Sequence, residues 1–481
     1  MQHSYYNVIV DSDAGEHIIF NTLRGCLAVM NDAALASYKD LDGCYLNELA
    51  NAGFILEDAE SEALLQEQAF AADKEVSDWM AISLAPTLAC NYECPYCYEQ
   101  NHTKNEVISD DVINGVFRLV DKCWQRDHFK SFELAWYGGE PTLCLDVIEK
   151  VSSYLKSYCN KRNIKFDSTA LSNAGNIAKK TAERLAACGV TRCLPTIDGL
   201  RDLHNRRRLA RDRGDSFART LDGIKNLRNA GVEVGVAHNL DRNSVADFWQ
   251  LRKDLHANGL DIFPSLMKDY RGDFGCGSFA KPDFNLFTRE DYAWQVHEFF
   301  SKTPFTVDAL SLMLRPVRNF CRGQLKNYYV IAPSGDVVRC EGRIGNSEHR
   351  LFNVIEDFDI SKIQSPSYNP VRDSTCRKCP VLPLCKGQCA WDRATLDDGC
   401  HILKYTIGAY VKDYRNCFNE ASGALTVLVD SRDPIEFFAQ PFVCDYPGES
   451  VFAGTLSYKD EEDNSLTITK TRYRAKVKRR T

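Results

Sequence analysis

The sequence predicts an α/β fold, with a partial (βα)6 TIM-like barrel between a small N-terminal domain of a hairpin and helices and a cysteine-rich C-terminal domain. From Ala81 onward, short apolar segments alternate with helical stretches, which is typical of parallel βα units. Beyond about Asp273 this alternation fades, and seven cysteines follow from Cys321 to Cys400. We therefore expect a barrel followed by a separate domain.

At the N-terminus, residues 4–12 and 16–22 have the pattern of two strands around an Asp-Ala-Gly turn. Helical periodicity follows at about 31–50 and 59–74. Because these elements precede the barrel pattern and differ from it, they predict a small separate domain over residues 1–75.

The barrel domain, which we place at residues 76–272, is expected to contain six strands. Reactive groups of parallel sheets gather in the loops beyond the carboxyl ends of the strands. The motifs described below fall in these loops, so we expect one active site at this edge. The expected strands are 81–87, 131–136, 166–171, 191–197, 232–239 and 261–266.

After the barrel, the sequence divides into a connecting segment at 273–320, a cysteine-rich domain at 321–420 and a C-terminal extension at 421–481. The extension contains a strand-like TVLVD segment (426–430), an acidic patch (459–463) and a terminal basic run. Charge runs of this kind are usually solvated, so we assign no chemistry to the tail.

The charge balance limits the class of partner. With 59 Lys and Arg against 66 Asp and Glu, the chain of 481 residues has a net charge of −7, which argues against nucleic acid as the main partner. It shows neither an apolar stretch near the roughly 18 residues that cross a bilayer nor a signal-like start, so we expect a cytoplasmic protein without a membrane partner. In a reducing cytosol, its 20 cysteines are expected to be metal ligands or buried apolar residues rather than disulfides.

Cys90, Cys94 and Cys97 follow the first barrel strand and form a C-x3-C-x2-C loop. Three thiolates on one loop can hold three corners of a [4Fe–4S] cluster and leave the fourth iron open as a reaction site. A structural zinc ion is the alternative, but it needs four closed ligands, commonly in C-x2-C pairs. The spacing therefore favours an iron–sulfur cluster over zinc.

This loop resembles the motif of the radical S-adenosylmethionine (SAM) superfamily, in which an aromatic residue, here Tyr96, precedes the third cysteine. The Trp-Tyr-Gly-Gly-Glu-Pro segment that ends the second strand resembles the family's GGEP segment. The resemblance implies that its backbone and carboxylate meet the SAM amino group, and glycine permits such a close backbone approach. The residues concerned are Gly138, Gly139, Glu140 and Pro141.

Two later segments extend the resemblance. Ser-Asn at the end of the third strand is similar to the family's Thr-Asn-Gly position, although Ala174 stands where glycine is expected. After the fourth strand, Thr-Ile-Asp-Gly resembles a Ser-x-Asp-Gly segment, and His204 begins an H-x3-R pattern. Hydroxyl, carboxylate and guanidinium groups suit the ribose and carboxylate of SAM. The SAM contacts that the resemblance implies are Ser172, Asn173, Thr196, Asp198 and Arg208.

Of the three consecutive arginines at 206–208, we expect Arg208 to be the ligand and the other two to lie on a solvated helix face. Segments 215–217 and 239–241 also resemble segments of peptide-modifying members and are expected to be structural turns. In the family, an electron from the cluster splits SAM into methionine and a 5′-deoxyadenosyl radical, which abstracts a hydrogen atom. The resemblance therefore implies an oxidoreductase that needs an external electron donor such as flavodoxin or ferredoxin.

A second set of cysteines follows the barrel, in the pattern C-x13-G-x4-C and then C-x2-C-x5-C-x3-C with one more cysteine. One closed zinc site would leave several of these thiolates unexplained. The set resembles the SPASM extension of radical SAM peptide maturases, which holds two auxiliary [4Fe–4S] clusters and so implies three clusters in all. The resemblance assigns Cys321, Cys340 and Cys389 to the first auxiliary cluster and Cys376, Cys379, Cys385 and Cys400 to the second.

Two ligand positions stay open. The first auxiliary set has three members, so its fourth iron either accepts a substrate sulfur, which we favour, or is closed by another residue such as Cys276. Cys417 is the alternative to Cys400 as the last ligand of the second set. The remaining cysteines are expected to be buried and inert.

The resembling enzymes crosslink ribosomally synthesised peptides through thioether or carbon–carbon bonds, or convert a Cys or Ser of sulfatases to formylglycine. In the sulfatase-maturating branch, an Asp follows the cysteine equivalent to Cys340 and acts as a base. Here Glu341 stands there, which favours peptide crosslinking, although either carboxylate can accept a proton.

The N-terminal hairpin and helices resemble a leader-recognition element, whose exposed strand edge could capture a leader peptide as an added strand. A plain capping domain is the alternative. From another class, a non-catalytic zinc- or cluster-stabilised binding protein also stays open at this point.

Overall fold

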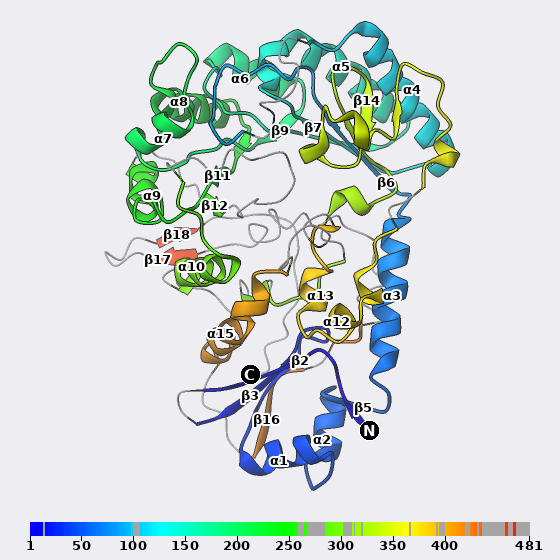
Figure 1. Ribbon diagram of the computed structural model, residues 1–481, viewed down its shortest axis with the longest axis vertical. Coiled ribbons are helices and arrows are strands. Elements are labelled where there is room, and N and C mark those ends of the chain that lie inside the picture. Colours follow the sequence, from blue (N-terminus) through cyan, green and yellow to red (C-terminus); the bar gives the residue numbers. More distant parts are fainter. Residues whose placement is uncertain are drawn as a thin grey trace. The chain divides into compact units, whose positions relative to one another are not determined.

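A computed structural model (Figure 1) gives the arrangement of the chain, which forms two compact units. The first, called the barrel unit, comprises Glu75–Thr288 and Gly323–Pro366. The second, called the terminal unit, comprises Met1–Lys74, Arg289–Arg322 and Ser367–Thr481. The structure describes residues 1–12, 15–97, 99, 106–257, 264–266, 284–301, 310–311, 313–318, 321–364, 367–390, 393, 400–418, 424–430, 432–434, 457–459 and 465–467.

Within the described residues, the barrel unit is built on an eight-stranded sheet with the order β10-β9-β8-β7-β6-β13-β14-β15. Neighbouring strands from β10 to β13 run parallel, whereas β14 and β15 add antiparallel. β11 and β12 form a further parallel pair. The strands are β6 (Trp79–Leu84), β7 (Ser131–Trp136), β8 (Lys165–Ala170), β9 (Val190–Cys193), β10 (Glu233–Val234), β11 (Val236–His238), β12 (Pro264–Leu266), β13 (Tyr328–Ile331), β14 (Asp336–Val338) and β15 (Phe352–Asn353).

Each of the six segments expected to be barrel strands contains a strand, which confirms the α/β fold with a parallel core. The segment at 232–239 is divided at Gly235 into β10 and β11. β13 is an addition that sequence analysis missed. It pairs in parallel with β6, from Tyr328 opposite Ala81 to Ile331 opposite Leu84, and so brings part of the cysteine-rich sequence beside the first barrel strand.

Helices cover one face of this sheet (Figure 1). Ile82 and Leu84 of β6 join a core that includes Val116 of α4. Because successive side chains of a strand point to opposite faces, Ser83 points to the other face. The helices of the unit are α4 (Asp110–Asp127), α5 (Leu145–Lys161), α6 (Lys179–Ala187), α7 (Arg201–Arg207), α8 (Ser216–Asn229) and α9 (Phe248–Ala257), and its 3₁₀ turns are η2 (Pro141–Cys144), η5 (Glu341–Arg343), η6 (Ser347–His349) and η7 (Ile360–Lys362).

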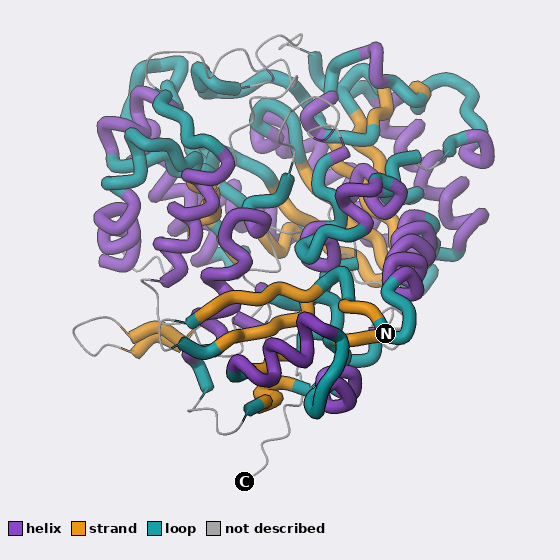
Figure 2. Tube along the Cα trace, turned by 60° about the horizontal axis from the view of Figure 1, so that its bottom comes forward, coloured by secondary structure: helices purple, strands orange, loops and turns teal. Residues whose placement is uncertain are grey.

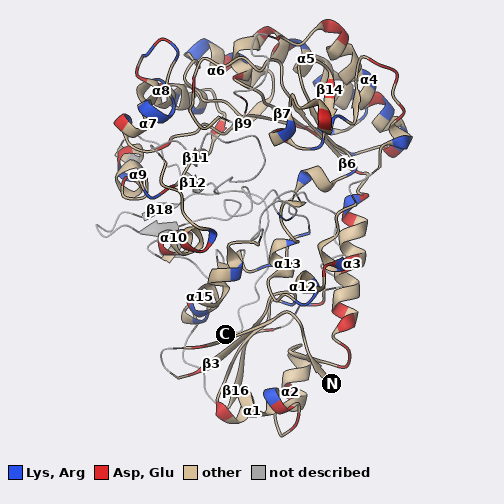
Figure 3. Ribbon diagram, in the orientation of Figure 1, with Lys and Arg blue, Asp and Glu red and all other residues tan. Residues whose placement is uncertain are grey.

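Acidic and basic residues are interspersed on these helices (Figure 3). Lys150 of α5 lies 2.6 Å from Asp110 at the start of α4, and Arg184 of α6 lies 2.6 Å from Glu149 of α5. Exposed pairs of this kind contribute little to stability. None of the helices that the structure describes combines the length and apolar character needed to span a bilayer.

The terminal unit contains an antiparallel sheet with the order β16-β4-β3-β2, whose strands run across the front of Figure 2. The expected hairpin is present as β2 and β3. The expected helix at 31–50 is divided into α1 and α2, because Leu41 takes a left-handed conformation (φ 53°). The strands are β1 (Gln2–His3), β2 (Asn7–Asp11), β3 (His17–Asn21), β4 (Leu27–Met30), β5 (Ile55–Leu56), β16 (Leu425–Val429), β17 (Ser457–Lys459) and β18 (Ser465–Thr467).

The helices of the terminal unit include short turns that carry cysteines. Cys376 lies in α12, and Cys385 ends α13. The helices are α1 (Asp32–Asp40), α2 (Leu46–Asn51), α3 (Glu60–Lys74), α10 (Arg289–Ser301), α12 (Ser374–Arg377), α13 (Leu382–Cys385) and α15 (Leu403–Asn416), with the 3₁₀ turn η8 (Pro370–Arg372). The 3₁₀ turn η4 (Arg322–Gln324) begins with the last residue of the segment Arg289–Arg322 and continues into the barrel unit.

The strand-like segment of the C-terminal extension completes the N-terminal sheet. β16 lies antiparallel along β4, and the pairing continues beyond the strand, where Asn31 N donates to Ala424 O at 2.8 Å. None of the residues of β16 is buried, whereas all four residues of β4 are. β16 is therefore held by its pairing with β4 and by the partly buried side chains of Leu425, Leu428 and Val429, which pack against the hydrophobic core.

Candidate active site

The three cysteines of the expected cluster motif lie together on the loop after β6. Cys94 is buried, and Cys90 and Cys97 pack against it in a small group with Tyr92 and Ala210. Burial raises the pKa of the Cys90 and Cys97 thiols to about 12, and nearby carboxyl groups and the other thiols contribute to the rise. A buried group of three thiols ionises readily only when a positively charged centre binds them, and an iron–sulfur cluster supplies such a centre.

Main-chain bonds hold this loop against the segment that follows α7. Tyr92 and Ala210 form an antiparallel bridge, and Arg211 N donates to Asn91 O at 3.0 Å. The guanidinium of Arg211 also donates to the carbonyl of Cys90 at 2.7 Å. The cysteine loop is thus paired like a short strand, which the spacing of the cysteines did not predict.

Gly138 and Gly139 let the second loop approach the chain that leads into Cys90. A Cβ atom at Gly138 would lie 2.3 Å from the carbonyl oxygen of Thr87, and one at Gly139 would lie 2.2 Å from that of Ala89. Gly138 also has a φ of 104°, which side chains rarely adopt. The packing of two loops therefore requires glycine at both positions.

Glu140 is completely buried, and its carboxylate accepts hydrogen bonds from Ser172 Oγ and Asn173 N, both at 2.8 Å. Burial raises the pKa of this carboxyl, and its hydrogen bonds oppose the rise. Pro141 follows as the first residue of η2. Asn173 Nδ2 in turn donates to Asn91 Oδ1 at 2.7 Å. Glu140 therefore joins the GGEP loop to the third-strand loop, and protein donors already occupy the carboxylate that the resemblance assigned to SAM.

Ala174 has a φ of 57°, in the left-handed region. The position thus has the conformation that glycine adopts most easily, although this chain places alanine there. α8 packs directly on the turn, since a Cβ atom at Gly223 would lie 1.9 Å from the carbonyl oxygen of Ala174. Alanine at this position, where the resemblance expects glycine, therefore keeps a left-handed conformation at the cost of local strain.

A buried polar network joins the cysteine loop to the ends of later strands. Tyr96 OH donates to the carboxylate of Asp198 and accepts from Arg208 Nη1 at 2.6 Å. Asn239 Nδ2 lies 2.6 Å from Asp198 Oδ1 and 3.1 Å from Tyr96 OH. Burial raises the pKa of Tyr96 well above its ordinary value, so the phenol stays protonated. Sequence analysis assigned Asn239 to a structural turn and missed its place in this network.

The neighbouring arginines differ from one another. Arg206 is exposed, as expected. Arg207 is buried and pairs with Asp241 at 2.6 Å, with side chains only 1% and 2% exposed. The expectation of a solvated face is therefore wrong for Arg207, because a loop distant in sequence supplies a buried counter-charge. Thr196, which is half-buried, forms an isolated parallel bridge with Ala237 beside the same network.

The cysteine loop, the GGEP loop and the ends of the third and fourth strands thus meet in one hydrogen-bonded site. Residues 84–255, which match the profile of the Radical SAM superfamily, contain all of these elements. The chain contains a radical SAM domain. This assignment excludes the alternative of a non-catalytic binding protein, and it implies a [4Fe–4S] cluster and SAM.

Two relatives and one solved structure are similar to this radical SAM enzyme. It is 24% identical over 371 residues to the radical SAM cyclopropyl synthase TigE of Paramaledivibacter caminithermalis, over 70% of this chain and 75% of the relative. It is 24% identical over 326 residues to a cysteine-type anaerobic sulfatase-maturating enzyme of Clostridium novyi, over 62% and 84%. Native anSMEcpe with bound AdoMet and Cp18Cys peptide matches with a TM-score of 0.54 and 18% identity, over 70% of this chain and 99% of that one, which shows a shared fold.

Four of the C-terminal cysteines lie together in the terminal unit. Cys376 and Cys379 pack against the core that contains Cys385. Burial raises the pKa of Cys376 to about 11, and the nearby thiols of Cys379 and Cys400 contribute to the rise. These four cysteines are the set that the resemblance assigned to the second auxiliary cluster.

Cys417, the alternative last ligand, makes a different contact. Its thiol donates to the carbonyl oxygen of Asp413 at 3.4 Å, one turn earlier in α15. Among the described residues, no three His, Cys, Asp or Glu side chains are arranged to hold a single metal ion.

The cysteines assigned to the first auxiliary cluster belong to both units. Cys340 follows β14 in the barrel unit, whereas Cys321 and Cys389 belong to the terminal unit. Cys276, the candidate for a closing ligand, lies outside the described residues.

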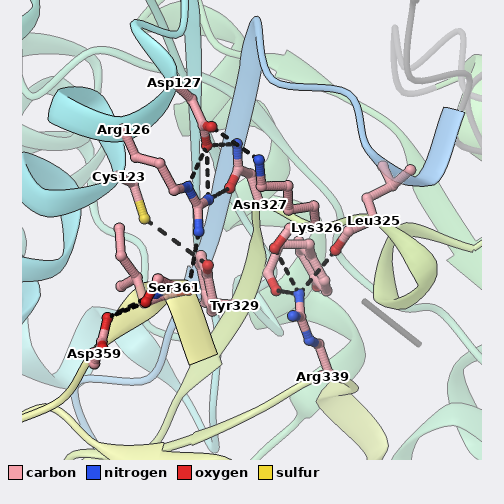
Figure 4. Close-up of polar contacts among 12 residues, drawn as sticks. Cys123, Arg126, Asp127, Leu325, Lys326, Asn327, Tyr329, Arg339, Asp359 and Ser361 are labelled. Atoms are coloured by element: carbon pink, nitrogen blue, oxygen red, sulfur yellow. Dashed lines mark hydrogen bonds and ion pairs between the residues drawn. The ribbon is translucent and has the colours of Figure 1, made fainter. Parts of the chain in front are cut away.

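A polar network fixes the segment that carries Cys340 to the barrel (Figure 4). At the end of α4, Asp127 accepts from Lys326 Nζ and Asn327 Nδ2, both at 2.9 Å. Arg339, directly before Cys340, donates through Nη1 at 2.8–2.9 Å to three carbonyl oxygens, those of Leu325, Lys326 and Tyr328. The position of Cys340 in the barrel unit is therefore set by contacts of Arg339 with the residues just before β13 and with Tyr328 at its start, and this segment is in turn held to the end of α4 by Asp127.

Glu341 follows this cysteine and lies beside the first barrel strand. Its Oε1 accepts hydrogen bonds from Ser83 Oγ at 2.7 Å and from Tyr328 OH at 2.6 Å. Ser83 belongs to β6, the strand that leads to the cysteine loop. A half-buried carboxylate is thus held in the barrel unit by two hydroxyl donors.

Proposed function

We propose that this radical SAM enzyme modifies a ribosomally synthesised peptide by forming a thioether or carbon–carbon crosslink. The observation that carries the proposal is the carboxylate of Glu341, which is hydrogen bonded to Ser83 on the strand that leads to the cysteine loop. A peptide substrate is supported by the sulfatase-maturating relative and by the Cp18Cys peptide in the solved anSMEcpe structure.

In this proposal, Cys90, Cys94 and Cys97 hold the first cluster, which together with SAM supplies a 5′-deoxyadenosyl radical that abstracts a hydrogen atom from the peptide. Gly138 and Gly139 keep the neighbouring loop packed against this cysteine loop. Burial of the site excludes water, which would otherwise quench the chemistry.

The polar network around Tyr96 binds SAM. The guanidinium of Arg208 and the amide of Asn239 suit a carboxylate and ribose hydroxyls, because both present hydrogen-bond donors in fixed directions. Asp198 accepts from both Tyr96 and Asn239 and so orients them. Thr196 adds a half-exposed hydroxyl at the same edge.

Glu341 acts as the base. An oxidative crosslink removes two hydrogens from the peptide, of which one leaves as an atom and the other as a proton together with an electron. Ser83 and Tyr328 both bind Oε1, so Oε2 is the oxygen that takes the proton. The electron passes to an acceptor in the enzyme, for which the C-terminal cysteines provide a site.

The C-terminal cysteines hold two auxiliary [4Fe–4S] clusters in this proposal, as in a SPASM domain, which makes three clusters in all. The clustering of Cys376, Cys379, Cys385 and Cys400 supports the second of them. The first takes Cys321, Cys340 and Cys389, with one iron open to a substrate sulfur. A small electron-transfer protein such as flavodoxin or ferredoxin supplies the reducing electron.

Maturation of a sulfatase is the second candidate function, and the name of the Clostridium novyi relative favours it. Glu341 argues against it, because the resembling branch has Asp at this position. The two functions differ in product, since one gives an internal crosslink and the other a formylglycine.

A leader segment of the peptide is proposed to guide binding through the N-terminal sheet. β16 already pairs with β4, so the outer strands of this sheet are β16 and β2, and an added leader strand pairs with one of these two or displaces β16.

The test is anaerobic incubation with SAM, reductant and candidate peptides, followed by mass measurement. A loss of two hydrogens is expected for a crosslink. Glu341→Gln should lower product formation by about 10²- to 10⁴-fold, the usual contribution of a general base, while SAM cleavage to 5′-deoxyadenosine persists. Glu348→Gln, at an exposed carboxylate in η6, is the matched control and should behave as wild type. Full product formation by the Glu341 variant would refute the assignment.

A further inference from the structure

An arginine side chain bridges two of the clustered cysteines in the terminal unit. Arg393 Nη1 lies 3.4 Å from Cys400 Sγ, and Nη2 lies 3.5 Å from Cys376 Sγ. A second cation, Lys404 Nζ, lies 3.6 Å from the same Cys400 sulfur. Two of the four sulfurs assigned to the second auxiliary cluster thus accept hydrogen bonds from positively charged groups.

The guanidinium of Arg393 is held in place by the residue that caps α12. Its Nη2 lies 3.1 Å from Asp373 Oδ2. The other carboxylate oxygen, Oδ1, accepts from Thr375 N at 2.8 Å and from Cys376 N at 3.2 Å. Arg393 is therefore positioned relative to the helix turn that carries Cys376, so its contact with the sulfur does not depend on a freely rotating side chain.

A third cation lies close to the same group of cysteines. Lys386 follows Cys385 directly, is buried, and donates to Gln66 Oε1. Burial of a positive charge is unfavourable unless nearby negative charge compensates it. Asp73 is the main compensating charge for Lys386, and Cys385 contributes as well. A [4Fe–4S] cluster with four thiolates carries net negative charge, so Arg393 and Lys404, which contact the sulfurs directly, suit such a cluster.

We propose that Arg393 is a positioning residue that raises the reduction potential of a [4Fe–4S] cluster held by Cys376, Cys379, Cys385 and Cys400. Reduction adds one negative charge to a cluster, and charged hydrogen bonds to its ligand sulfurs stabilise that charge. The inference rests on the proposed function, which places the second auxiliary cluster on these thiols. Its consequence is that this cluster accepts electrons more readily than the cluster on Cys90, Cys94 and Cys97.

The experiment is an anaerobic redox titration of the reconstituted full chain, followed by electron paramagnetic resonance. Added SAM identifies the signal of the cluster on Cys90, Cys94 and Cys97, because SAM binds to this cluster and changes its signal. The variants are Arg393→Gln, which removes the charge, and Arg393→Lys, which retains it. Arg372→Gln is the matched control, since Arg372 is exposed and pairs with Glu67 instead of a cysteine.

Arg393→Gln should lower the potential of one auxiliary cluster, with wild-type iron content and an unchanged potential for the cluster that responds to SAM. Arg393→Lys should give a smaller decrease, and Arg372→Gln none. An unchanged potential in Arg393→Gln would overturn the proposal. Loss of about four irons per chain, the content of one cluster, would also overturn it, because Arg393 would then be needed to hold the cluster. If the auxiliary clusters of the proposed function do not exist, wild-type protein itself would bind the iron of only one cluster. This result differs from an unchanged potential in Arg393→Gln, so the two failures can be told apart.

Discussion

The two groups of cysteines are built in different ways. The loop with Cys90, Cys94 and Cys97 is held by main-chain pairing with other loops of the barrel. The set that includes Cys376 and Cys385 lies on short turns, α12 and α13, close together in the sequence. The first group is therefore one short loop held by pairing with distant segments of the barrel, whereas Cys376 and Cys385 of the second group lie on separate short helical turns.

The charges around the two groups also differ. After burial, the strongest charge effects on the pKa of Cys90 and Cys97 come from carboxyl groups, Glu140 and Glu99, which raise it. For Cys376, the strongest charge effect after burial comes from Arg393, which lowers it. Negative charge near a cluster disfavours an added electron and positive charge favours it. Arg393 therefore suits an electron-accepting site in the terminal unit. In the barrel unit, burial raises the pKa of Glu99 to about 8, so this carboxyl is largely protonated near neutral pH and adds little negative charge.

Removing one thiol from each group of cysteines should give the largest effect, and it tests whether the two groups have separate roles. Cys94→Ala should abolish SAM cleavage to 5′-deoxyadenosine, because the barrel cluster has only three protein ligands. Cys400→Ala should lower the iron content by about four atoms per chain and leave SAM cleavage in place. Cys417→Ala, at a thiol that bonds within its own helix, is the control and should keep its iron. Iron analysis and chromatography of the cleavage products measure these effects, and loss of SAM cleavage in both cluster variants would contradict separate roles.

The polar network of the barrel site should produce the next largest effect. Arg208→Ala removes the guanidinium that we propose to bind SAM. A charged hydrogen bond is worth about 1.5–3 kcal/mol, so SAM binding should weaken by about 10- to 100-fold. Arg206→Ala is a matched control on the same helix, because Arg206 is exposed. Isothermal titration of the reconstituted protein with SAM measures both. Equal affinities for the two variants would place SAM away from Tyr96.

Acid should weaken the barrel site through His204. Burial and the nearby Arg208 charge lower the pKa of this histidine to about 3, whereas an unfolded histidine titrates near 6.5. Below about pH 6.5 the unfolded chain therefore binds a proton that the folded site does not, and the free energy of unfolding falls by up to about 1.4 kcal/mol per pH unit as the pH drops toward 3. In His204→Asn this part of the slope should disappear, which urea unfolding at several pH values measures. Identical slopes in variant and wild type would contradict it.

The strained turn at Ala174 should give the smallest effect. Ala174→Gly relieves a left-handed conformation that disfavours alanine by about 1–2 kcal/mol, and the greater freedom of glycine in the unfolded chain offsets about 0.4–1 kcal/mol of this gain. A net stabilisation of about 0.5–1 kcal/mol is expected. Ala182→Gly is the control, because Ala182 lies inside α6, where glycine is less stable than alanine, and the variant should lose stability. Denaturant midpoints compare the two, and destabilisation of both would exclude strain at Ala174.

Much of the barrel followed from the sequence. The six strand segments and the motifs at their ends were found because apolar strands alternate with helices, and because parallel strands place their carboxyl ends at one edge. β13 could not be found in this way, because it is separated from its partner β6 by about 240 residues of chain and carries no motif.

Within the site, two residues were also misassigned because their partners are distant in the sequence. Asn239 looked like part of a turn, and Arg207 looked solvated, because neither has a local partner in the sequence. Asn239 joins Tyr96 across 143 positions, and Arg207 pairs with Asp241 across 34. Residue type and spacing therefore identified the cysteine loop and Arg208 but not the side chains that complete the network.

The sequence by itself determined the α/β fold, the cysteine spacing and the radical SAM motifs, because these are repeated patterns or short segments whose residues act together locally. Only the tertiary structure showed that β16 joins the N-terminal sheet and that Glu341 accepts a hydrogen bond from Ser83 of β6. It also placed Arg393 between two clustered sulfurs. These contacts depend on how separate segments pack, and packing is a property of the whole core that no short stretch of sequence specifies.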